Sequence, residues 1–63
     1  MYFVKTVYEE GKPNITRYVD EDTAKNMIRA TNEWGIDVVS CELVEKETAL
    51  AEVRAQKVEY DRA

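Results

Sequence analysis

The side chain best suited to nucleophilic chemistry in this sequence is Cys41, the only cysteine among 63 residues. A thiol becomes reactive when a neighbouring base or cation holds it as the thiolate, and the sequence contains no histidine to act as that base. Cys41 also falls in an apolar, β-branched stretch, where a free cysteine is usually buried. We therefore interpret Cys41 as a structural thiol, and we expect no catalytic residues and no enzymatic activity.

Metal and cofactor chemistry has equally little support from the residue types present. One cysteine without histidine cannot assemble a zinc site. The run Asp20-Glu21-Asp22 lacks the alternating ligands and the central glycine of a calcium loop, and it is better explained as the first turn of a helix. Gly11 and Gly35 are the only glycines, too few for a phosphate-binding loop. The sequence predicts neither a metal site nor a cofactor.

Two cations, Lys5 and Arg17, are candidates for ligand contact because they lie in strand-like segments rich in aromatic residues. A small anionic ligand such as a nucleotide is one interpretation, and an internal ion pair with Glu42 is the alternative. Trp34 is interpreted as a core or staple residue, with an interface anchor as the alternative. The candidate binding residues are Phe3, Lys5, Arg17, Tyr18, Trp34 and Tyr60.

The elements that position these residues follow from composition and periodicity. Residues 2–8 and 15–19 are rich in aromatic and β-branched side chains, and the Gly, Pro and Asn between them predict a hairpin. Asp20 is placed to cap a helix that ends at Gly35, with Ile36 making the hydrophobic contact that accompanies such a stop. Residues 36–45 predict a third strand, and residues 47–63, which lack Gly and Pro, predict a second helix.

The predicted fold class is α+β, with the order ββαβα in a single domain that spans residues 1–63. A right-handed crossover through the first helix makes the third strand parallel to the second, which gives a three-stranded antiparallel sheet of order 2-1-3. Strand alternation then places a nearly charge-free set of side chains beneath the first helix. This set is Tyr2, Val4, Thr6, Tyr8, Thr16, Tyr18, Val39, Cys41 and Leu43.

The reverse face of this sheet combines six apolar side chains with a charged row formed by Arg17, Lys5 and Glu42. A small monomer rarely leaves such a surface open to water. We expect the C-terminal helix either to cover this face or to mediate oligomerisation. The thin apolar stripe of that helix, carried by Leu50, Val53 and Tyr60, favours the shared arrangement, and so does the short chain. A homo-oligomer is therefore expected.

Charge and terminal composition narrow the location and the partners. The net charge of −4 disfavours nucleic acid as a partner. No apolar stretch is long enough to predict a membrane span. The N-terminal residues lack the basic and apolar regions of a signal peptide, and together with the lone cysteine this favours a cytoplasmic protein.

Three functional hypotheses follow, from different classes. The leading one is a small non-enzymatic protein that binds and occludes a partner protein, in the manner of an inhibitor from a phage or another mobile element. The alternative is an oligomer that sequesters a small anionic ligand, such as a nucleotide, near Lys5 and Arg17. A third hypothesis, single-stranded nucleic-acid binding by Phe3, Lys5 and Arg17, is opposed by the acidic charge.

Overall fold

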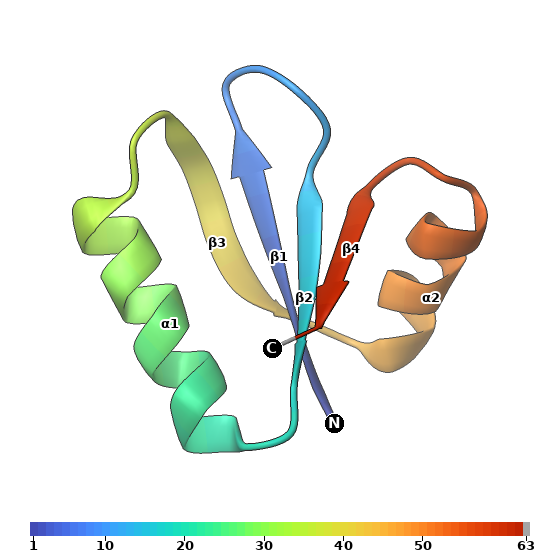
Figure 1. Cartoon of the computed structure of the whole chain (residues 1–63), viewed down its shortest axis with the longest axis horizontal. Helices are drawn as coiled ribbons and strands as arrows, with labels where there is room; N and C mark the ends of the chain where they lie inside the picture. Colours follow the sequence, from blue (N-terminus) through green and yellow to red (C-terminus); the bar gives the residue numbers. More distant parts are fainter. Residues whose placement is uncertain (63) are drawn as a thin grey trace.

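A computed structural model describes residues 1–62 and the side chains of residues 1–61 (Figure 1). A four-stranded sheet lies between two helices, one on each face. The strands are β1 (Tyr2–Tyr8), β2 (Asn14–Tyr18), β3 (Val38–Val44) and β4 (Glu59–Arg62), and the helices are α1 (Glu21–Trp34) and α2 (Lys46–Arg54). Among the described residues, neither helix is long and apolar enough to cross a membrane.

Helix α1 begins and ends at the residues that the sequence predicts. Asp20 is the N-cap, and its Oδ2 accepts a hydrogen bond of 3.0 Å from the Thr23 backbone N–H. Gly35 closes the helix by donating its N–H to the Thr31 carbonyl over 2.8 Å. The Gly35 backbone is extended, so the need for glycine is spatial: a Cβ there would overlap the Thr31 carbonyl oxygen and Val38 Cγ2. The predicted capping contact of Ile36 is wrong, because this side chain is exposed.

The sheet has the order β3-β1-β2-β4, so the predicted order 2-1-3 is present with one strand added. Strand β1 pairs antiparallel with both β2 and β3, which makes β3 parallel to β2 as the crossover rule requires. Strand β4 pairs parallel to β2, so the sheet is mixed and the predicted three-stranded antiparallel sheet is corrected.

The additional strand replaces the end of the predicted C-terminal helix. Helix α2 ends at Arg54, and the chain turns at Gln56, whose φ of 56° lies in the left-handed region. Strand β4 then joins the sheet through a 2.9 Å hydrogen bond from the Glu59 N–H to the Pro13 carbonyl. Tyr60 therefore lies on a strand rather than on the apolar stripe of a helix. Residue 63, the last of the predicted helix, lies outside the described residues.

Each face of the sheet has its own core, and the predicted division of the two faces is confirmed with one exchange. Beneath α1, Val4, Tyr18 and Cys41 pack with Ala24. The predicted member Val39 is replaced there by Val38, because the register between β1 and β3 shifts after Val7 and leaves Val39 as an extra residue.

The second core is covered by α2 of the same chain. Phe3, Ile15, Ala49 and Val58 are buried together, with Val44 and Val53 packed against them. The reverse face that motivated the expected homo-oligomer is thus closed within the chain. The argument from an uncovered face therefore no longer supports that assembly, and the argument from the short chain stays a prediction.

Candidate functional site

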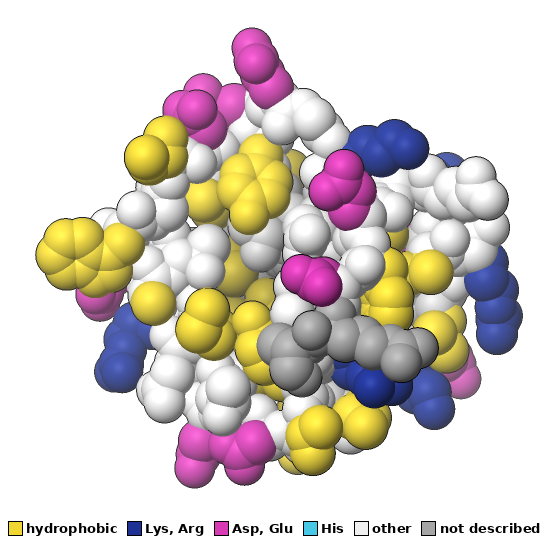
Figure 2. Space-filling model, viewed as in Figure 1, with side chains coloured by type: hydrophobic (Ala, Val, Ile, Leu, Met, Phe, Trp, Pro, Cys, Tyr) yellow, Lys and Arg dark blue, Asp and Glu magenta, His cyan; other side chains and the backbone are white. Residues whose placement is uncertain are grey.

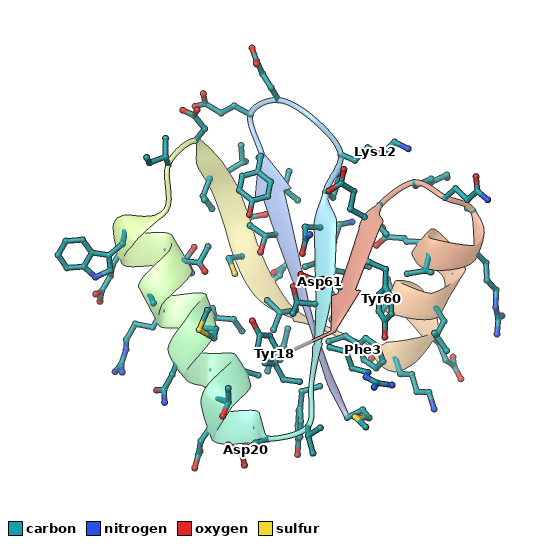
Figure 3. All side chains as sticks on the ribbon, viewed as in Figure 1. Phe3, Lys12, Tyr18, Asp20, Tyr60 and Asp61 are labelled. Carbon is teal, nitrogen blue, oxygen red and sulfur yellow. The ribbon has the colours of Figure 1, made fainter. Side chains whose placement is uncertain are left out.

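The residues proposed from sequence as a binding surface are divided by the fold among three places. The register of the strands places four of them on the face beneath α2: Phe3, Lys5, Arg17 and Tyr60. Phe3 is buried in the core and Arg17 is half-buried, whereas Tyr60 is exposed on β4. Figure 3 shows Phe3 and Tyr60 between the sheet and α2, with Tyr18 on the other side of the sheet. These residues do not form one continuous binding surface.

Lys5 is engaged inside the domain. Its Nζ donates a 2.6 Å hydrogen bond to Glu52 Oε1 on α2, and both side chains are largely shielded from water. The predicted ion pair with Glu42 is therefore replaced by one with Glu52. The predicted row Arg17, Lys5, Glu42 is confirmed on the β3 side, where Glu42 lies opposite Lys5. It is wrong on the β2 side, where Ile15 lies opposite Lys5 and Arg17 lies opposite Phe3. Glu52 Oε2 is buried and has no hydrogen-bond partner among the described residues, so this carboxylate depends on Lys5 alone.

Tyr18 and Cys41 form the polar part of the core beneath α1. Thr6 Oγ1 donates to Cys41 Sγ over 3.3 Å, and Cys41 is buried as expected from sequence. Burial raises the pKa of the Tyr18 hydroxyl above 10.0, and the nearby Cys41 and Asp61 raise it further. These groups are packed within the domain, so they offer no surface to a ligand.

Three of the four most exposed large apolar side chains among the described residues lie where α1 ends and β3 begins. Trp34, Ile36 and Val39 are 82%, 83% and 63% exposed. We call this set the α1–β3 corner. The core or staple interpretation of Trp34 is wrong, and its alternative as an interface anchor agrees with this exposure. Sequence reasoning missed Ile36 and Val39, because it assigned the first to a helix stop and the second to the core.

Backbone and side-chain hydrogen bonds hold the corner in place. The Glu9 N–H donates to the Asp37 carbonyl over 2.9 Å, which ties the β1–β2 hairpin to the start of β3. Asp37 has a φ of 59°, a left-handed conformation that Asp tolerates better than most residues. Asn32 Nδ2 donates to the Cys41 carbonyl over 3.3 Å and ties the last turns of α1 to β3. The apolar side chains are therefore presented by a tethered turn.

The surroundings of the corner are acidic. Two carboxylates, Glu33 and Asp37, lie in the corner; Glu42 lies farther along β3 and Glu45 beyond its end, and from Glu33 to Glu45 the sequence contains no Lys or Arg. None of the four takes part in an ion pair among the residues whose side chains are described. Figure 2 shows hydrophobic side chains projecting over the C-terminal end of α1 with acidic side chains close by. The corner therefore combines exposed apolar side chains with the carboxylates of Glu33 and Asp37.

The described part of the chain encloses no pocket and brings together no group of three or more Cys, Asp or Glu side chains able to hold a metal ion. Comparison with models of protein families, with curated proteins and with solved structures found no match. The exposed surface of the domain is therefore the feature from which a function can be proposed.

Proposed function

We propose that this protein is a small non-enzymatic binding domain that docks onto a partner protein through the α1–β3 corner. The observation that carries the proposal is the concentration of exposure at one place: Trp34, Ile36 and Val39 are three of the four most exposed large apolar side chains among the described residues, and the fourth, Val19, lies at the other end of α1. Contiguous exposed apolar side chains mark interaction sites, and tryptophan is the residue most enriched at the energetic centre of interfaces.

A domain of this size acts most simply by occlusion. A domain this small can cover part of a partner's surface but offers few residues for any other action. This supports the more specific hypothesis that the binding domain is an inhibitor. The proposed docking surface is the corner, whereas the sequence predicted the reverse face of the sheet. Of the predicted binding residues, only Trp34 belongs to the corner.

The sequestering oligomer has no observation in its favour. Lys5, one of its two proposed anion contacts, is paired with Glu52, and the face that was to join the subunits is covered by α2. We do not carry this alternative forward.

Affinity capture with three matched baits tests the proposed function. The baits are the wild-type chain, the double variant Trp34→Ala/Ile36→Ser, and Val19→Ser as the control. Val19 is an equally suitable apolar target because it is 70% exposed but precedes α1, at the opposite end of the helix from the corner. Proteins retained by the wild type and by Val19→Ser should be lost with the double variant. Equal retention by all three baits contradicts the proposal.

A further inference from the structure

We infer that the partner presents an extended segment of alternating basic and apolar residues, which pairs as an additional strand with the open edge of β3. This inference rests on the proposed function and specifies the chemistry of the partner. Strand addition of this kind obtains affinity from main-chain hydrogen bonds and specificity from alternate side chains.

The outer edge of β3 is available for such pairing. β3 ends the sheet, and it pairs only with β1 among the described residues. Its seven residues include a single charged one, Glu42. Exposed sheet edges are usually blunted by shortness, charge, proline or a β-bulge. The irregularity in β3 is confined to Val39 near its start, and from Ser40 to Val44 the strand pairs with β1 in regular register.

The side chains of β3 specify the pattern of the added strand. Leu43 lies opposite Val4 on the α1 face and is partly exposed, whereas Glu42 lies opposite Lys5 on the other face and is exposed. An added strand places its alternate residues beside these two positions. Residues beside Leu43 should be apolar, and residues beside Glu42 should be basic.

The charge of the region argues for a basic foreign segment rather than a second copy of this chain. Pairing of two β3 edges would bring Glu33, Asp37 and Glu42 of both copies onto one interface, and each copy also carries a net charge of −4. Like charges in an interface disfavour association, whereas Lys or Arg side chains complement these carboxylates and accelerate encounter.

One carbonyl on this edge, that of Cys41, already accepts a hydrogen bond from Asn32. In an antiparallel ladder alternate residues direct their N–H and C=O groups outward, and the bond from Asn32 marks Cys41 as one of them. The carbonyl has a second lone pair, and the 3.3 Å bond is long enough to be shared or exchanged. The backbone of Leu43, which points the same way by alternation, is the central contact expected for an added strand.

An NMR titration of the full chain tests this inference with a short peptide of alternating valine and lysine. We expect shift changes concentrated in the amides of β3, with binding that weakens as salt is added. The same peptide with glutamate in place of lysine should leave β3 unchanged. N-methylation of alternate peptide nitrogens, which removes the hydrogen bonds of one strand edge, should weaken binding about tenfold or more.

A charge-neutralised protein supplies the matched control. The variant Glu33→Gln/Asp37→Asn/Glu42→Gln should bind the lysine peptide roughly five- to tenfold more weakly, and asparagine at 37 keeps the left-handed backbone available. Equal shifts with the acidic peptide, or unchanged β3 amides at saturating lysine peptide, overturn the inference. If capture still depends on Trp34 and Ile36 in that event, the docking corner stands and strand pairing is wrong. If capture ignores the corner, the proposed function fails whatever the peptide does.

Discussion

The two ends of the sheet use apolar side chains differently. At the β4 end, Val58 packs with Phe3 and Ile15 beneath α2, and the short strand reads Glu-Tyr-Asp-Arg, so its edge is charged. At the β3 end, the strand is longer and nearly uncharged, and Trp34, Ile36 and Val39 stand in water beside it. The α2 and β4 side therefore contributes apolar burial to the fold, whereas the α1–β3 corner contributes little and is the surface that we propose for binding.

The largest loss of stability is expected from a cavity in the core beneath α2. Phe3→Ala should lower the free energy of unfolding by about 3–5 kcal/mol, which approaches the whole stability of a domain this small. Ile15→Val, at a fully buried position, provides a graded version that should lose about 0.5–1.5 kcal/mol. Urea denaturation followed by circular dichroism measures both. A loss below that of Ile15→Val for Phe3→Ala would contradict the assignment of this core.

A smaller effect is expected from the ion pair that links β1 to α2. Lys5→Ala leaves the shielded Glu52 carboxylate without a partner, and it should cost about 1–3 kcal/mol. The double variant Lys5→Met/Glu52→Met removes both charges and should recover most of that loss. A double-mutant cycle in urea denaturation measures the coupling. Additive single losses would show that the pair does not stabilise this side of the domain.

The pH dependence of stability reports on the core beneath α1. The pKa of Tyr18 is raised in the folded state, so the neutral hydroxyl stabilises the fold at pH below 10.0, and this contribution is lost as pH rises through the folded pKa. Unfolding free energy should fall more steeply above pH 10.0 in the wild type than in Tyr18→Phe. Urea denaturation across an alkaline series gives both slopes. Parallel slopes would mean that Tyr18 titrates as it does in the unfolded chain.

The smallest effect on stability is expected at the corner. Trp34→Ala should change the free energy of unfolding by no more than about 0.5 kcal/mol, since an exposed side chain contributes few packing contacts. Trp34 is the only tryptophan, so the fluorescence of the wild type should show the emission and the ready quenching of a water-exposed indole. A loss comparable to that of Phe3→Ala would place Trp34 in the core and remove the contrast between the two sides.

Local signals account for the parts of the fold that the sequence predicts correctly. The Asp20 cap, the first strand and the division of the sheet faces depend on residues close in sequence or on strict alternation. Strand β4 was missed because Lys57 and Glu59 suit a helix as well, and only pairing with the distant β2 makes this segment a strand.

The candidate site was harder to predict because the exposure of a helical residue depends on its angular position around the helix axis. Trp34 follows Ala24 at helical spacing, but at 3.6 residues per turn it lies roughly 80° around the helix from it. Ala24 faces the sheet and Trp34 faces water. The register shift that moves Val39 out of the core carries no sequence signal that we can identify.

Amide hydrogen exchange with and without the captured partner tests the docking corner most directly. The account predicts that exchange slows in β3, with Leu43 among the protected amides, and that it stays unchanged in β4. Protection of β4 instead of β3 would contradict the assignment of the corner as the binding surface, and protection of neither edge would contradict strand pairing with β3.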